Sequence, residues 1–261
     1  MNLVWGIVIG VIALTVLVVL HELGHALVAR RNGVRVEEFG IGFPPAAYKK
    51  NVKKSFLGKN VVYSVNWLPL GGFVKLQGEH DDDKKPGDYG AATFWQKTKI
   101  LLAGVMMNWL TAVILLTILA WFGLPQLVPH QFTVASDTHV IYNPVVLASI
   151  EKDLPAENAG LKSGDAVISV NGEKIKTSAQ LSEVSAAHKG EMVRVTYKRD
   201  GTERVAHVAL RSANDDKRGY LGAGLSQERL TRSTWSAPIV GVGVTMQLTG
   251  ITLQGLGQVI G

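Results

Sequence analysis

The sequence predicts a multi-pass α-helical membrane protein with a membrane-associated β-hairpin region and an inserted α+β domain. Uncharged, mostly apolar stretches occur at 3–20, 100–124 and 233–261. They concentrate the 47% hydrophobic residues of the chain in a few segments. An apolar run of about 20 residues is long enough to span a bilayer. Between the second and third stretches, residues 130–212 are charged and alternate between strand-like and short helical patterns.

The first apolar stretch is expected to be a retained transmembrane helix within residues 1–31. A cleaved signal peptide needs a basic segment before its apolar core and a small-residue cleavage site. Neither is present, because the first charged side chain is Glu22. Arg30 and Arg31 follow, and Gly33 is part of a helix-stop signal. Because basic residues flank membrane segments on the cytoplasmic side, the N-terminus is expected outside the cytoplasm.

This helix ends in the sequence His21-Glu22-Leu23-Gly24-His25. Side chains four residues apart project from the same face of a helix, so both histidines can reach one metal ion. The glutamate beside them is the candidate general base of a metal-dependent hydrolase. The chain has no cysteine, so His, Asp or Glu must hold any metal. The spacing therefore predicts a hydrolytic metal site at the end of a membrane helix.

Residues 32–93 read as a β region followed by a polar loop. The segment 61–68 is rich in β-forming residues, 69–72 is a turn signal, and 73–76 is expected to be the return strand. This hairpin is either a soluble cytoplasmic structure or a segment that dips into the membrane inside protein or a wet cavity. The polar loop contains His80, Asp81, Asp82 and Asp83, for which a solvated loop is favoured over a metal cluster.

The second membrane helix is expected at 94–125, with Lys97 and Lys99 at its cytoplasmic end. Within it, Asn108 is a polar side chain in an apolar helix, which is costly unless it has a partner. One interpretation is a hydrogen bond between helices, with Gly104 allowing close packing. The other is a contact with the active site or the substrate.

The inserted region at 130–212 strongly resembles a PDZ domain of the bacterial protease-associated type. The resemblance rests on the sequence PAENAGLKSGD at 155–165, which is followed by a strand at 166–170 and an Asn-Gly turn. A PDZ domain binds an extended peptide by adding it to its sheet as a strand. The groove strand is expected at 144–150, facing a helix at 179–187. Its candidate peptide-binding residues are Val145, Val146 and Leu147.

Together these motifs resemble a site-2-protease-type intramembrane zinc metalloprotease of the regulator-of-sigma-E protease (RIP metalloprotease) group. The matching features are the motif at 21–25, the segment 34–43, the sequence PLGGFVK at 69–75, the Ala-Gly…Asn pattern of the second helix and the PDZ domain after it. They cover essentially the whole chain. At the end of a membrane helix, and followed by Pro-Leu-Gly-Gly and a PDZ domain, the His-Glu-x-x-His motif is highly specific.

The resemblance implies a zinc-dependent endopeptidase for regulated intramembrane proteolysis. His21 and His25 would bind Zn2+, and Glu22 would polarise the metal-bound water that attacks a peptide bond of a single-span membrane protein. The residues implied in holding the unwound substrate are Asn108, Gly71, Gly72 and Phe73. The usual substrates in the family are anti-sigma factors and remnant signal peptides.

The resemblance also implies a location in the cell membrane, with the active site near the cytoplasmic face. The PDZ domain would lie outside the cytoplasm and bind a peptide C-terminus or exclude an attached substrate ectodomain. The segment 233–261 would either span the membrane or lie on its surface. Nucleic acid is not an expected partner, because the net charge is only +6 and no aromatic-basic pattern occurs. The basic flanks of the apolar segments suit lipid head groups instead.

The sequence departs from the family pattern in two ways. Val105 stands where the family has a proline after the glycine of the second helix. The third zinc ligand of the family, an aspartate in an Asn-Pro…Leu-Asp-Gly setting, has no counterpart, so the chain is expected to be a truncated or incomplete form of a longer protein. The alternative function is a catalytically inactive membrane anchor that presents a PDZ peptide-binding module. A protease of the membrane-embedded CAAX kind is disfavoured by the PDZ insert.

Overall fold

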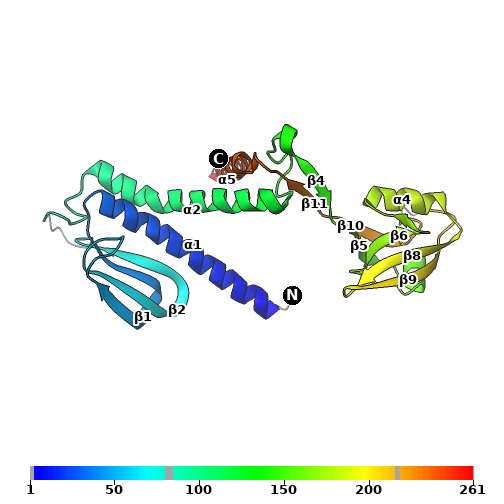
Figure 1. Ribbon diagram of the computed structural model, residues 1–261, viewed down its shortest axis with the longest axis horizontal. Coiled ribbons are helices and arrows are strands. Elements are labelled where there is room, and N and C mark those ends of the chain that lie inside the picture. Colours follow the sequence, from blue (N-terminus) through cyan, green and yellow to red (C-terminus); the bar gives the residue numbers. More distant parts are fainter. Residues whose placement is uncertain (1–2, 80–84, 215–217, 261) are drawn as a thin grey trace. The chain divides into compact units, whose positions relative to one another are not determined.

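Three long helices span most of the apolar sequence in the computed structural model, which describes residues 3–79, 85–214 and 218–260 (Figure 1). They are α1 (Leu3–Arg31), α2 (Phe94–Phe122) and α5 (Ala237–Ile260). Each contains a stretch that is long and apolar enough to cross a bilayer. The chain divides into two compact units, 1–115 and 116–261. The expected loop at His80–Asp83 lies outside the described residues.

In the first unit, α1 packs against an irregular sheet formed by β1 (Val36–Val52) and β2 (Val61–Leu76) (Figure 1). Both strands bend back on themselves. The pairing shows this, since Ile41 of β1 is paired with both Val65 and Gly72 of β2. The strand segments therefore lie in the order 46–52, 61–66, 36–41 and 72–76. The turn expected at 69–72 is a bend within a continuous β2 instead.

The end of α1 joins this sheet to the second helix. Gly33 has a φ of 84°, the left-handed conformation that glycine adopts readily and that commonly ends a helix. Before it, Ala26 and Ala29 are fully buried in a core that also contains Phe39 and Ile100. The C-terminal turns of α1 are thus held between the sheet and the first turns of α2.

The second unit contains a sheet with strand order β10-β5-β6-β8-β9, with β7 paired to β6. Its elements are β5 (Val145–Ile150), α3 (Pro155–Asn158), β6 (Ala166–Val170), β7 (Glu173–Lys174), α4 (Ser178–Ala187), β8 (Met192–Arg199), β9 (Thr202–Ala209) and β10 (Ala223–Ser226). The domain was expected to end at residue 212, but β10 completes its sheet by pairing with β5. Its core is built from the inward side chains of these strands and of α4, including Leu147, Leu181 and Val195.

A second, three-stranded sheet has the order β3-β11-β4. Its strands are β3 (Leu124–Pro125), β4 (His139–Tyr142) and β11 (Arg229–Arg232), and the short helix η1 (Ala135–Asp137) precedes β4. Residues 139–142 therefore belong to this sheet rather than to the PDZ-type sheet in which the expected boundaries placed them.

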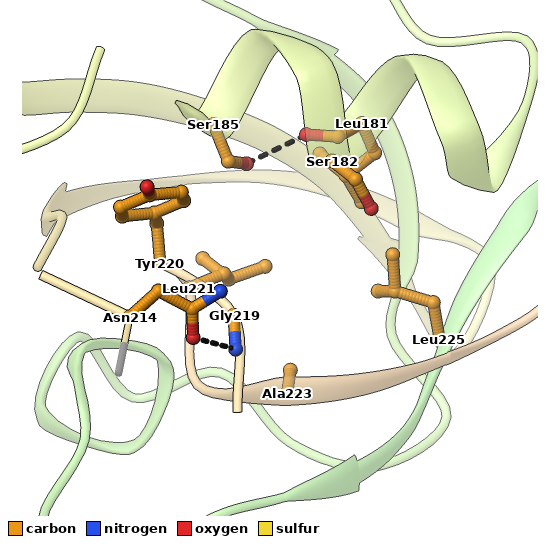
Figure 2. A pocket seen from close by; sticks show the side chains of 9 residues that line it. All are labelled: Leu181, Ser182, Ser185, Asn214, Gly219, Tyr220, Leu221, Ala223 and Leu225. Carbon is orange, nitrogen blue, oxygen red and sulfur yellow. Dashed lines mark hydrogen bonds between the residues drawn. The ribbon is translucent and has the colours of Figure 1, made fainter. Parts of the chain in front are cut away.

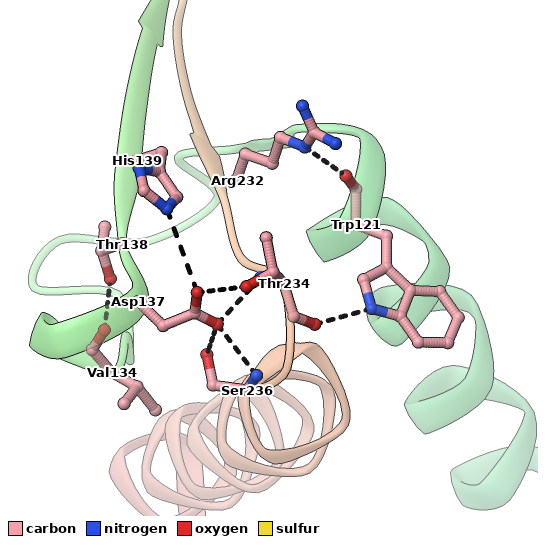
Figure 3. Close-up of polar contacts among 8 residues, drawn as sticks. All are labelled: Trp121, Val134, Asp137, Thr138, His139, Arg232, Thr234 and Ser236. Atoms are coloured by element: carbon pink, nitrogen blue, oxygen red, sulfur yellow. Dashed lines mark hydrogen bonds and ion pairs between the residues drawn. The ribbon is translucent and has the colours of Figure 1, made fainter.

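Asp137 joins this second sheet to the start of α5 (Figure 3). Its buried carboxylate accepts hydrogen bonds from the backbone N–H and hydroxyl of both Thr234 and Ser236, at 2.5–2.9 Å. Burial raises the pKa of Asp137, but these four hydrogen bonds outweigh it and hold the pKa well below its usual range. The carboxylate thus pairs with the N–H groups of Thr234 and Ser236, which precede α5, and anchors the segment that leads into this helix.

Candidate active site and peptide groove

His21 and His25 face each other on one side of α1. Their ring centroids are 4.7 Å apart in an edge-to-face arrangement, and their Nε2 atoms are 3.1 Å apart. The other ring nitrogens contact α2: His25 Nδ1 lies 2.6 Å from the Ile100 carbonyl oxygen, and His21 Nδ1 lies 3.2 Å from Asn108 Nδ2. A carbonyl oxygen only accepts hydrogen bonds, so His25 Nδ1 carries a proton and Nε2 presents a lone pair.

The helix α2 makes room for these rings with Gly104. A Cβ atom added there would stand 2.5 Å from His21 Nε2 and also collide with His25. On the opposing helix, a Cβ at Gly24 would stand 2.5 Å from the Ala103 carbonyl oxygen and 2.9 Å from Met107 Cβ. Small residues of this kind allow two helix backbones to approach closely. The two glycines therefore bring the histidine pair directly against the backbone of α2.

The donor set fits part of a zinc site. Two imidazole nitrogens bound to one tetrahedral zinc ion at about 2.0–2.1 Å lie roughly 3.3 Å apart. The observed 3.1 Å between the Nε2 atoms is close to this separation. The Nδ2 atom of Asn108 faces His21 Nδ1, and the buried Oδ1, which has no hydrogen-bond partner among the described residues, would reach a proton on Nδ1 if the amide turned over. Zinc ligands commonly donate their second ring N–H to such an acceptor.

A third ligand is not found within 3–79, 85–214 and 218–260, where no group of three or more His, Asp or Glu side chains can hold one metal ion. Asp81, Asp82 and Asp83, which were disfavoured as ligands, are outside these ranges. Glu22 is partly buried beside the pair. The described site thus consists of two ligands and one carboxylate.

The other residues expected at the substrate lie on β2, next to α1. A Cβ at Gly71 would stand 3.1 Å from Val18, and one at Gly72 would stand 3.1 Å from Val19. Phe73 packs over Gly40 of β1. The two glycines therefore have a packing role against the helical turn before His21, and substrate binding by this segment stays a prediction.

The expected PDZ groove strand is wrong. Val145, Val146 and Leu147 lie in β5, which is paired with β10 on one side and with β6 on the other. The backbone groups of an interior strand are already paired, so β5 has no free edge for a peptide. The edge strand on this side of the sheet is β10.

A cavity of about 290 Å3 lies between β10, the loop before it and α4 (Figure 2). Its floor is apolar, with Leu181, Leu221 and Leu225, and its rim is polar. The lining residues are Leu181, Ser182, Ser185, Asn214, Gly219, Tyr220, Leu221, Ala223 and Leu225. A free strand edge beside a helix and an apolar pocket is the geometry that strand-addition peptide sites require. The structure therefore moves the candidate groove from 144–150 to 219–226.

Comparisons with known proteins identify the family. A membrane helix pair that carries His-Glu-x-x-His, joined to a PDZ domain, defines the class of site-2-protease-type metalloproteases. The model of Peptidase family M50 matches residues 9–260, and the chain therefore belongs to this family. With its three apolar helices, it is a membrane protein.

Individual relatives are similar over most of this chain. A Clostridium acetobutylicum protein whose name marks it as a candidate zinc metalloprotease is 29% identical over 218 residues, covering 84% of this chain and 58% of that protein. Zinc metalloprotease Rip1 of Mycobacterium tuberculosis is 30% identical over 221 residues, covering 81% of this chain and 53% of Rip1. The chain spans about half the length of the curated relatives it matches. The PDZ domain of an SdrC-like protein from Listeria monocytogenes is 29% identical with a TM-score of 0.30, covering 33% of this chain and 92% of that one.

Several functional features were missed by the sequence reasoning. The Ile100 carbonyl is a backbone group and leaves no sequence signal. Gly104 was noted only for helix packing, although its position four residues before Asn108 places both on the face that meets His21. The strand β10 has only four residues, one of them glycine, so it has no clear alternating pattern.

Proposed function

We propose that this chain carries the histidine ligands of a zinc-dependent intramembrane endopeptidase that cleaves single-span membrane proteins. The observation that carries the proposal is the convergence of the His21 and His25 Nε2 atoms at 3.1 Å, inside a pair of helices that are apolar enough to span a bilayer. Structural packing does not need two partly buried imidazoles that face each other. Zinc binding does, and the family relationship supports it.

The roles of the residues follow from their chemistry. His21 and His25 would hold the ion through Nε2, and the Ile100 carbonyl fixes the ring of His25 by accepting a hydrogen bond from its Nδ1–H. Zinc, when bound, acts as a Lewis acid that lowers the pKa of a coordinated water to about 7. Glu22 accepts a proton from the attacking water on its carboxylate and returns it to the leaving amide nitrogen.

Substrate access follows from the position of β2 beside α1. A membrane-spanning helix hides its backbone amides in its own hydrogen bonds, so the scissile segment must be extended before attack. Gly71 and Gly72 lie against Val18 and Val19, in the helical turn that precedes His21, and this contact supports a strand beside the site. We infer that this strand region holds the extended substrate, as the sequence predicted for Gly71, Gly72 and Phe73.

The basic residues after α1 favour an active site near the cytoplasmic face, with the N-terminus and the PDZ domain on the other side. The PDZ groove beside β10 would bind the C-terminus of a peptide or of a trimmed ectodomain. Anti-sigma factors and remnant signal peptides are the substrate classes that the family resemblance implies.

The test is cleavage of a model single-span substrate in proteoliposomes by the chain and by its Glu22→Gln variant. We expect cleavage by the first and at least a hundredfold less by the second, because proton transfer is lost. Equal cleavage by both proteins would refute the role of Glu22. Zinc content gives a separate measure: His21→Ala is expected to lose the metal, whereas Glu22→Gln is expected to keep it.

The alternative function, a membrane-anchored peptide-binding module without catalysis, is favoured by one observation. Only two metal-binding side chains converge in the part of the chain that the structure describes. A chain that binds PDZ peptides, contains no zinc and cleaves nothing would establish this alternative.

A further inference from the structure

The side-chain amide of Asn108 contacts His21 through one end only, and its other end is buried without a partner among the described residues. Its Nδ2 atom lies 3.2 Å from His21 Nδ1, while its buried Oδ1 has no partner among the described residues. Buried polar atoms are nearly always hydrogen-bonded, so each exception calls for an explanation. The two ends of an amide have the same shape, and the protons around them decide which end faces the histidine.

Without a metal, the orientation with Nδ2 toward His21 gives one consistent chain of hydrogen bonds. Asn108 Nδ2 donates to His21 Nδ1, His21 Nε2 donates to His25 Nε2, and His25 Nδ1 donates to the Ile100 carbonyl. A neutral imidazole carries one proton, so His21 carries its proton on Nε2. This is the atom that must present a lone pair to a metal ion. His21 is thus in the wrong tautomer for zinc, whereas His25 is already in the correct one.

Metal binding requires the other tautomer of His21, with the proton on Nδ1. With Nε2 bound to an ion, the remaining proton is on Nδ1, which then faces Asn108 as a donor. A donor cannot pair with the amide NH2 group. We propose that Asn108 is a positioning residue for His21, and that its amide turns over on metal binding so that Oδ1 accepts the Nδ1 proton and holds His21 in the metal-binding tautomer.

The rotation does not stabilise the amide by itself. It pairs Oδ1 and moves Nδ2 into the buried position where Oδ1 had no partner, so one unpaired atom replaces another. Without a metal, the first orientation is favoured because it keeps the hydrogen bond between the two Nε2 atoms. A bound ion takes the place of that hydrogen bond and favours the rotated amide. This makes Asn108 a switch that is coupled to metal occupancy, unlike the fixed carbonyl of Ile100.

The inference rests on the proposed zinc site, and the zinc affinity of the full chain tests it by chelator competition. Asn108→Leu keeps the approximate size but has no acceptor, so we expect zinc binding about 10–100-fold weaker. In Asn108→Asp, either carboxylate oxygen can accept a hydrogen bond from His21 Nδ1–H. We therefore expect a zinc affinity at least equal to that of the unaltered chain. Equal weakening by both variants would overturn the proposal, because it would show that size or the NH2 donor is what matters.

Asn66→Leu is the matched control. Asn66 is a buried asparagine of the same unit whose Oδ1 likewise has no partner among the described residues, and its Nδ2 donates to the Gly42 carbonyl at 3.0 Å rather than to a histidine. We expect this variant to keep the zinc affinity, and a loss equal to that of Asn108→Leu would overturn the specific role of Asn108. If the unaltered chain binds no zinc, the proposed function fails first, and this inference fails with it.

A spectroscopic measurement reports the tautomer directly. In chain labelled with 15N-histidine, the His21 signals are those missing from a His21→Ala sample. We expect the proton on Nε2 without zinc and on Nδ1 with zinc, and in Asn108→Asp on Nδ1 in both states. The same tautomer with and without zinc in the unaltered chain would overturn the rotation.

Discussion

The Thr15 hydroxyl in α1 donates a hydrogen bond of 2.5 Å to the Pro69 carbonyl oxygen in β2. Thr15 lies within the uncharged run 3–20, which is the part of α1 that would cross the hydrocarbon core. This hydrogen bond places the bend of β2 beside the uncharged run of α1. Trp67, Leu68 and Leu70, which flank this bend, are at least half exposed. This contact favours the membrane-dipping interpretation of the hairpin over the soluble one.

Cysteine labelling in vesicles measures the depth of this bend. The chain has no cysteine, so each introduced thiol is unique. Leu70→Cys and Lys50→Cys both lie on exposed positions of the same sheet. We expect a membrane-impermeant maleimide, supplied on both sides, to label the Lys50 variant readily and the Leu70 variant at least tenfold more slowly, because lipid excludes the reagent. Equal rates would support the soluble hairpin.

Gly104→Ala tests the space that α2 leaves for the histidine pair. The added methyl would collide with His21 and His25 and push the rings apart. A displacement of about 1 Å at a catalytic group can lower the rate about a hundredfold, and we expect a loss of this size together with weaker zinc binding. Gly10→Ala in α1 is the control, since no atom lies within 4 Å of the added carbon. Equal activity of the two variants would contradict the assigned contact.

The PDZ groove beside β10 predicts a contrast between two adjacent positions of α4. Ser182 lines the 290 Å3 cavity, whereas Glu183 is exposed on the same helix and does not line it. We expect Ser182→Trp to fill the cavity and weaken peptide binding at least about tenfold, which corresponds to roughly 1.4 kcal/mol. Glu183→Trp should leave binding unchanged. Fluorescent peptides ending in a free valine, leucine or alanine provide the measurement.

An ion pair in the same domain predicts a stability difference. Asp165 is 1% exposed and binds Arg199 through two hydrogen bonds of 2.7 and 2.6 Å. Removing one partner of a buried pair leaves the other charge unpaired, so we expect Asp165→Asn to lower the free energy of unfolding by about 3 kcal/mol. Glu151→Gln, which alters an exposed contact of 3.9 Å with Arg218, should change it by less than about 1 kcal/mol. Denaturant unfolding of the full chain compares the two.

The same pair predicts a dependence on pH. Burial raises the pKa of Asp165, but hydrogen bonds from Arg199 and from the Lys162 backbone outweigh burial and lower it below its usual value. A carboxyl group with a lowered pKa in the folded state contributes stability above its unfolded pKa of about 3.9, and this contribution is lost as the pH falls further. Stability should therefore fall below about pH 4, and more steeply in the unaltered chain than in Asp165→Asn. Parallel curves would show that Asp165 does not contribute.

The elements that the sequence predicted well are those set by local physics. The apolar run before Glu22 and the left-handed Gly33 define α1, and the spacing of His21 and His25 places both rings on one face. The bent sheet was not predictable, because Ile41 pairs with Val65 and with Gly72 through long-range contacts. The peptide groove was placed on β5, the strand just before the PAENAGLKSGD sequence, whereas β10 lies far along the chain and is defined only by its position at the edge of the sheet.

Gly104 shows that the His-Glu-x-x-His motif alone is not sufficient to form the site, which also depends on the neighbouring helix. The ligands belong to α1, but the volume they occupy belongs to α2, which contributes to the site by having no side chain there. Moved alone into another membrane helix, the motif would meet the side chains of its new neighbours and its rings could not converge. Inserting such a site into a designed membrane protein therefore requires two matched spans, one that supplies the imidazoles and one that leaves them a gap.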